Sequence, residues 1–146
     1  QKPDNSFQDV TMNSFNHYAY GAIGEWLYQY IAGIVIDPAN PGYKHFFLRP
    51  HPGGGLTNAA ASYISMYGTI YSDWKIIDGK MYYSCSVPPN SSATITLEGV
   101  GKNDVELNRI PLLQNTKIRS TDSDGNLNLE VGSGRYDFIF PVKNDK

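Results

Sequence analysis

Asn16 and His17, at the start of the most strongly patterned segment of the chain, are the best candidates for ligand contact. An imidazole can donate a hydrogen bond to a ligand hydroxyl or accept one, according to its tautomer. Asn16 could orient that ring or simply continue a helix cap. Because a lone histidine is no motif, the residues alone favour a capping or otherwise structural His17. Ligand contact is the competing hypothesis.

Glu25 is the only formal charge in residues 14–34. A carboxylate held among apolar side chains is one way in which proteins make a general acid. No second carboxylate lies one or two turns away on the same face, so we favour a structural acid that bonds a neighbouring loop or helix end.

The remaining candidates do not form a metal or cofactor site. His45 and His51, with Asp37 as the nearest acid, lack the spacing of a metal centre, and we expect a strand histidine and a turn histidine. Cys85 is the single cysteine, which excludes an internal disulfide. The glycines of residues 53–55 precede a strand rather than a helix, so they are expected to form a turn and not a phosphate cradle. No cofactor and no metal are expected.

The candidate residues lie on a predicted helix from Ser14 to about Ile34. Apolar residues recur there every three or four positions, which is the helical period. Gly33 and the pair Asp37-Pro38 supply the stop signals. About twenty residues at 1.5 Å each give a helix of roughly 30 Å.

A second stripe on this helix contains Gly21 and Gly24 between His17 and Tyr28. A glycine in a helix interior costs about 1 kcal/mol relative to alanine, so close packing against another element is expected to compensate. A helix so poor in charge needs neighbours on most sides. A membrane span is not expected, because four polar side chains interrupt the apolar run: Asn16, His17, Glu25 and Gln29.

After Pro41-Gly42 the hydrophobic period changes to two, which is typical of strands. The predicted strands cover residues 43–49, 59–67, 69–77, 81–87, 93–97, 127–131 and 136–140. Asp78-Gly79 predicts a tight hairpin turn. The fold class is therefore mainly β: an antiparallel β-sandwich or jelly roll preceded by one long amino-terminal α-helix.

The aromatic residues of the sandwich give an alternative function. Trp74 shares strand parity with Ile70 and Ile76, so it is predicted to lie in the core. Tyr63, Tyr67 and Tyr71 could instead form an exposed or interfacial row, and aromatic faces can stack on sugar rings. An autonomous carbohydrate-binding module is thus a second hypothesis.

Several motifs, taken in order, resemble one enzyme family. Residues 12–28, which contain Asn13-Ser14-Phe15-Asn16-His17, are similar to the segment that opens the final inner helix of the (α/α)6 barrel in glycoside hydrolase family 78, the bacterial α-L-rhamnosidases. The likeness continues through residues 32–34, the turn at 50–56, residues 67–70 with Trp74, and residues 87–93. It covers most of residues 12–97.

This resemblance implies a carboxy-terminal part of an inverting hydrolase that removes terminal α-L-rhamnose from glycosides or polysaccharides. Residues 1–42 would be the last barrel helix with its flanking loops, and residues 43–146 the sandwich. Inversion needs two carboxyl groups roughly 6.5 to 9.5 Å apart. In the family one lies far upstream and the other in a Trp-Glu-Arg-Trp type motif just before the Asn-His pair, so neither is expected here.

The resemblance also assigns roles to residues and partners. His17 matches the family's sugar-contacting histidine, and Asn16 is a less certain second contact. The expected partners are the rest of the catalytic barrel and a rhamnose-containing carbohydrate. The chain alone is expected to be inactive, and its uncovered helix should promote self-association. The end of a different (α/α)6 glycosidase is a further alternative.

Composition narrows the remaining classes. The chain has 146 residues, of which 40% are hydrophobic, enough to fill a core. Its net charge is -2 and it contains no basic cluster, so nucleic acid is not an expected partner. The first ten residues do not read as a signal peptide or a natural start, which suggests a piece of a larger protein. The compartment stays open, with a periplasmic or secreted parent favoured.

Overall fold

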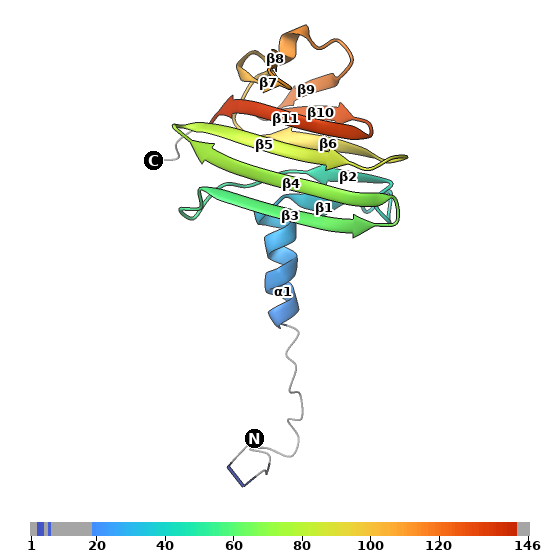
Figure 1. Cartoon of the computed structure of the whole chain (residues 1–146), viewed down its shortest axis with the longest axis vertical. Helices are drawn as coiled ribbons and strands as arrows, with labels where there is room; N and C mark the ends of the chain where they lie inside the picture. Colours follow the sequence, from blue (N-terminus) through green and yellow to red (C-terminus); the bar gives the residue numbers. More distant parts are fainter. Residues whose placement is uncertain (1–2, 5, 7–18, 143–146) are drawn as a thin grey trace.

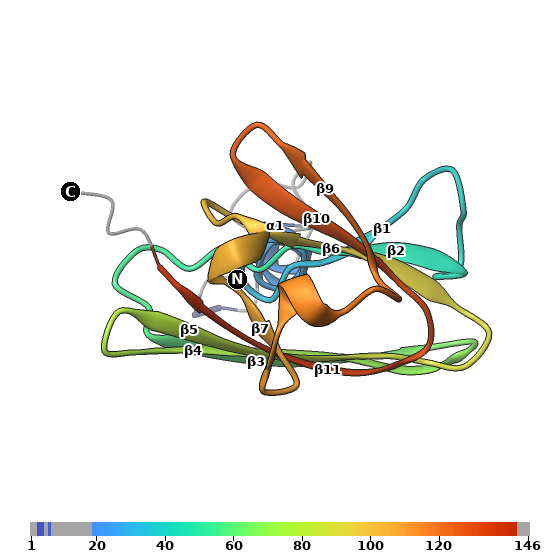
Figure 2. The same cartoon turned by 90° about the horizontal axis from the view of Figure 1, so that it is seen from above.

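The structure is a computed structural model that describes residues 3, 4, 6 and 19–142. Asn16 and His17 lie outside the described residues. The described chain consists of two packed sheets and one helix that projects from them (Figure 1). Seen along the helix, the two sheets form two separate layers (Figure 2).

One layer is a sheet of five strands, in the spatial order β1 (Ile34–Ile36), β2 (His45–Leu48), β6 (Ser92–Leu97), β10 (Asn126–Val131) and β9 (Arg119–Ser123). The other has six, in the order β3 (Asn58–Ser65), β4 (Gly68–Ile77), β5 (Lys80–Val87), β11 (Gly134–Pro141), β7 (Glu106–Leu107) and β8 (Ile110–Pro111). Two short 3-10 helices, Lys102–Asp104 and Leu112–Gln114, flank β7 and β8.

The strand pairings are antiparallel apart from β2 with β6, which is parallel. The parallel pair arises because β3, β4 and β5 are built in the other layer between these two strands. The predicted fold class, a mainly β, antiparallel sandwich preceded by an α-helix, is confirmed, although one strand pair is parallel. The helix is described only from Ala19 and has eight residues there before a five-residue π-helical turn, and the predicted start of the long helix lies outside the described residues.

Every second residue along a strand points into the space between the two layers, and these residues form the core. Met81, Tyr83, Cys85 and Val87 of β5 are all buried, as the period of two predicts. Trp74 has no exposed surface, which confirms that it is a core residue. Burial raises the pKa of the Cys85 thiol to about 12, so this thiol stays protonated at ordinary pH.

The hairpin turn at Asp78-Gly79 is also confirmed. It joins β4 to β5 with φ angles of 50° and 72°, and Asp124-Gly125 joins β9 to β10 with 53° and 75°. Two consecutive positive φ angles match the right-handed twist of the flanking strands, which is why aspartate-glycine pairs are favoured at these positions.

The helix ends earlier than the sequence predicts. Helix α1 (Ala19–Trp26) continues into a π-helical turn, η1 (Leu27–Ile31), and Gly33 then takes a φ of 73°. Ile34 is not helical, because it begins β1 and pairs with Leu48 of β2. The five-stranded sheet therefore includes residues 34–36, which precede residue 43, the expected first residue of the sandwich.

In Figure 1, α1 projects from the edge of the sandwich where β1 and β3 lie, and β8 and β9 lie at the opposite edge. None of the helices within the described residues has the length and apolar character needed to cross a membrane.

Candidate functional site

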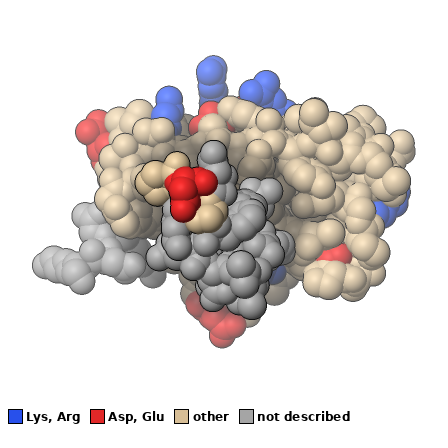
Figure 3. All heavy atoms as spheres, turned by 90° about the horizontal axis from the view of Figure 1, so that it is seen from below, with Lys and Arg blue, Asp and Glu red and all other residues tan. Residues whose placement is uncertain are grey.

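Helix α1 and the turn η1 expose apolar side chains on several sides. Ile23 is 59% exposed, Trp26 50% and Tyr30 56%. Glu25 is the only charged residue in these two elements. Viewed from the helix end of the molecule, uncharged residues make up most of the described surface (Figure 3). An added Cβ at Gly21 or Gly24 would meet nothing within 4 Å, so the sandwich does not pack against the glycine stripe.

The carboxy-terminal end of the helix, by contrast, is bonded tightly to the sandwich. Four consecutive carbonyl oxygens, those of residues 30–33, each accept a hydrogen bond from a sandwich donor. The donor and acceptor pairs are His51 N to Tyr30 O (3.2 Å), Trp74 Nε1 to Ile31 O (2.7 Å), Ser72 Oγ to Ala32 O (2.6 Å) and Arg49 N to Gly33 O (2.8 Å). We call these four bonds the helix anchor.

The two side-chain donors of the helix anchor are fully buried on β4. Ser72 and Trp74 both point into the core and have no exposed surface. The Tyr83 hydroxyl lies 3.3 Å from Ser72 Oγ, and burial raises the pKa of Tyr83 well above its ordinary value. Tyr83 therefore keeps its proton and can donate to Ser72, which leaves the Ser72 proton for the Ala32 carbonyl.

Sequence reasoning missed this helix anchor, although a signal for it was present. Ser72 is a polar residue at an inward position between Ile70 and Trp74, and a buried hydroxyl nearly always has a hydrogen-bond partner. An inward serine therefore indicates a nearby acceptor. The sequence could not indicate that the acceptor is a helix end 40 residues away.

Glu25 is exposed, and its Oε1 accepts a hydrogen bond of 2.8 Å from Gln29 Nε2. Both residues border a groove of about 390 Å³ between the helix and the sandwich. Tyr43 and Tyr63 form the other wall, with ring centroids 4.5 Å apart. Within the described residues Glu25 is thus a surface acid bonded to its own helix, and not to the neighbouring loop or helix end that the structural hypothesis expects.

His45 lies on β2 and His51 in the turn after it, as predicted. His45 Nδ1 lies 2.8 Å from Asp37 Oδ2, and His45 Nε2 lies 3.0 Å from Thr94 Oγ1. Thr94 in turn donates to Glu130 Oε1 at 2.8 Å. This network fastens the loop after β1 to the outer face of the five-stranded sheet. No group of three potential metal ligands occurs in the described part of the chain.

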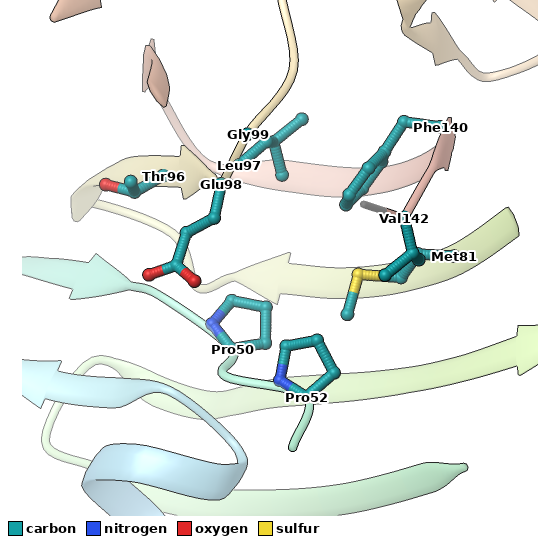
Figure 4. A pocket seen from close by; sticks show the side chains of 9 residues that line it. All are labelled: Pro50, Pro52, Met81, Thr96, Leu97, Glu98, Gly99, Phe140 and Val142. Carbon is teal, nitrogen blue, oxygen red and sulfur yellow. The ribbon is translucent and has the colours of Figure 1, made fainter. Parts of the chain in front are cut away.

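His51 joins the helix to a pocket of about 250 Å³ at one end of the sandwich (Figure 4). Its ring packs on Tyr30 with centroids 5.2 Å apart, and its Nδ1 lies 2.8 Å from Glu98 Oε1. Figure 4 shows Pro50 and Pro52 along one side of the pocket, across from Phe140 and Val142. The walls are half polar and half apolar, and Glu98 supplies one carboxylate.

The tyrosine row is not a single surface. Tyr63 pairs with Ile70, which is fully buried, so its side chain lies on the inner face of the six-stranded sheet. Tyr71 pairs with the exposed Ser62 and lies on the outer face, where its hydroxyl donates to Asp73 Oδ2 at 2.7 Å. Tyr67 sits in the turn between the two strands. The expectation of one exposed row is wrong, because the register of this hairpin places its two strand tyrosines on opposite faces.

The fold and the site together define a class: a β-sandwich to which a projecting, nearly uncharged helix is anchored. Comparison with known proteins specifies it further. The family model described as "Bacterial alpha-L-rhamnosidase C-terminal domain" matches residues 33–109, more than half of the chain. The chain belongs to this family, and the expected resemblance to α-L-rhamnosidases is confirmed.

Individual relatives agree with the family match. The α-L-rhamnosidase of Streptomyces avermitilis is 40% identical over 137 residues, which is 94% of this chain and 12% of that protein. An α-L-rhamnosidase of Formosa agariphila is 44% identical over 91 residues, 62% of this chain and 10% of that protein.

Solved structures show the same relation. The crystal structure of the Streptomyces avermitilis enzyme complexed with L-rhamnose superposes with a TM-score of 0.72 at 40% identity, over 97% of this chain and 13% of that one. The α-L-rhamnosidase from Dictyoglumus thermophilum gives 0.75 at 26% identity, over 93% and 15%. The chain thus spans 10% to 15% of the length of these relatives.

Proposed function

We propose that this chain is the carboxy-terminal part of an α-L-rhamnosidase that releases terminal α-L-rhamnose with inversion. In this part, the sandwich carries and positions the last helix of the catalytic barrel. The observation that carries the proposal, beside the family match, is the exposed and almost uncharged surface of α1 and η1.

A helix with apolar side chains on most sides is ordinarily buried. The sandwich contacts the carboxy-terminal end of this one, through the helix anchor, the 3.3 Å hydrogen bond from the Tyr28 hydroxyl to Ser62 O and the packing of His51 on Tyr30. It leaves Ile23 and Trp26 half or more exposed. The open space at Gly21 and Gly24 offers a second helix room for a close approach. We therefore propose that helices of the preceding barrel cover α1 in the intact enzyme.

The sugar-contacting roles of His17 and Asn16 belong to the same proposal. Both precede the first residue of α1 by two or three positions in the sequence, and at helical spacing His17 would share a stripe with Gly21 and Gly24. The stripe that is open to a neighbouring helix would thus lead, in the amino-terminal direction, to the bound sugar. The two catalytic carboxyl groups would come from the preceding part of the enzyme, so this chain would contribute binding and support.

The alternative of an autonomous carbohydrate-binding module loses its main argument. It needed Tyr63, Tyr67 and Tyr71 on one surface, and Tyr63 and Tyr71 lie on opposite faces of their sheet. Titration of the chain with rhamnose and rhamnose-containing oligosaccharides, with Tyr67→Ala as the comparison, separates the hypotheses. Saturable binding that Tyr67→Ala abolishes would favour the module.

The decisive test compares this chain with its full-length parent on an aryl α-L-rhamnoside. We expect hydrolysis by the parent and none by the chain, because the chain lacks the proposed acid and base. Proton NMR of the first product identifies its anomer, and inversion requires β-L-rhamnose to be seen first. Measurable turnover by the purified chain would overturn the proposal.

A further inference from the structure

The helix anchor holds the carbonyls at the end of the helix and just beyond it with donors from the sandwich. The last four carbonyls of a helix have no partner within the helix and commonly bond to water. Here the carbonyls of Tyr30 and Ile31 at the end of η1, and those of Ala32 and Gly33 just after it, accept from four donors that lie on β4 or just after β2. Donors from both layers of the sandwich thus hold one helix end, so the end can neither tilt nor rotate without breaking several bonds.

Two of the four donors are polar groups on buried side chains, and neither polar group is needed for packing. An alanine in place of Ser72 or a phenylalanine in place of Trp74 would keep an apolar interior, yet each would leave a buried carbonyl without a partner. Ile31 is 9% exposed and Ala32 2% exposed, so water has little access to their carbonyls. The Ser72 hydroxyl and the Trp74 indole N–H therefore serve the helix end, while the indole ring also fills the core.

We infer that Ser72 and Trp74 are positioning residues that set the direction of α1 and so, through the chain that precedes it, the placement of the proposed sugar contacts His17 and Asn16. The second half of this inference rests on the function proposed above. The helical residues from Ala19 to Ile31 span roughly 18 Å at about 1.5 Å each, so a tilt of about 5° at the sandwich end moves the far end by roughly 1.5 Å. A misplacement of about 1 Å can cost on the order of a hundredfold in rate.

The test uses the full-length parent enzyme with Ser72→Ala and Trp74→Phe, assayed below the unfolding temperature of every variant. Ser91→Ala is the matched control, because Ser91 is also buried and its Oγ donates 2.7 Å to the backbone carbonyl of Pro88, away from the helix. We expect both anchor variants to raise KM for an aryl α-L-rhamnoside and to lower kcat/KM about tenfold. Ser72→Thr, which keeps the hydroxyl, should restore most of the loss.

A merely structural role predicts a different pattern. In that case the anchor variants and Ser91→Ala would lose thermal stability alike and keep the KM of the native enzyme. Equal kinetic constants in the anchor variants and the control would therefore overturn the positioning role.

A second measurement does not depend on activity. Hydrogen exchange of residues 26–33 in the parent enzyme should be faster in Ser72→Ala than in Ser91→Ala, because the helix end frays once its partner is lost. Unchanged exchange would overturn the anchor itself. A parent without rhamnosidase activity would overturn the proposed function, and the exchange result would still decide whether Ser72 holds the helix.

Discussion

At the scale of single residues, Gly33 fixes where the helix stops and the sheet begins. Its φ of 73° lies in the left-handed region that side chains rarely adopt. A Cβ at this position would lie 2.2 Å from the backbone carbonyl carbon of Arg49. The chain could then not come close enough to Arg49 for β1 to pair with β2 as it does. Only glycine meets both conditions, which is why the turn into β1 is so short.

Asp37 gives a prediction about pH. Its carboxylate accepts hydrogen bonds from Asn40 Nδ2 at 2.8 Å and from the Ala39 N–H at 2.9 Å, and it faces His45. The pKa of Asp37 is lowered below its ordinary value of 3.8, mainly by the hydrogen bond from Asn40. The bond from Ala39 lowers it further, and His45 has a smaller effect in the same direction. Its contribution to stability is therefore present above pH 3.8 and is lost as the pH falls through the lowered pKa.

We expect Asp37→Asn to unfold at a lower temperature than the native chain near neutral pH, and the difference to shrink in acid. Thermal unfolding followed between about pH 6 and about pH 2.5 measures this. Asp122→Asn, on an exposed strand position, is the control and should change little. A difference between Asp37→Asn and the native chain that stays constant across this range would contradict the assignment.

At the scale of elements, α1 has a sequence of low helix propensity, yet its carboxy-terminal end is held rigidly by the helix anchor. Its two glycines are unfavourable in an isolated helix, and nothing in the described chain packs against them. In the isolated chain, replacing a glycine of this helix should therefore increase helix stability. In the intact enzyme, we expect a neighbouring helix to limit the side chains that fit at the same two glycine positions.

Gly24→Ala tests this difference directly. In this chain alone, the alanine should favour the helix by about 1 kcal/mol, since its Cβ has open space. Far-ultraviolet circular dichroism should show more helix. In the full-length parent, the same change should lower the unfolding temperature, because a closely packed helix would meet the added methyl group. Stabilisation in both contexts would rule out a close neighbour at this stripe.

At the scale of the whole molecule, the exposed helix makes the isolated chain prone to associate. Ile23, Trp26 and Tyr30 expose half or more of their surface on adjacent turns. Apolar patches of this kind usually mark an interface or a tendency to aggregate. The covering partner in the intact enzyme would be the barrel, and in its absence a second copy can take that place.

We therefore expect the average mass of the chain in sedimentation or light scattering to rise with concentration. The double substitution Ile23→Lys and Trp26→Lys should keep it monomeric. Ile110→Lys is the matched control, since Ile110 is 53% exposed but lies on β8, at the opposite edge of the sandwich. A native chain that stays monomeric at high concentration, or an effect of Ile110→Lys as large as that of the double variant, would contradict this prediction.

The sequence by itself determined the parts of the molecule that depend on neighbouring residues. The period of two placed Met81 and Val87 on one buried face, and Asp78-Gly79 marked its hairpin, because side-chain direction and turn geometry are local properties. The order of its motifs was also sufficient to indicate the family, which the match over residues 33–109 confirms.

Only the tertiary structure decided what depends on distant pairing. Ile34 continues the helical period in sequence, yet its pairing with Leu48 makes it a strand residue. The faces of Tyr63 and Tyr71 depended on the register of one hairpin. Trp74 was predicted to be buried, but its bond to Ile31, 43 residues away, could not be predicted. A buried polar group requires a partner, and only the folded chain determines which one it reaches.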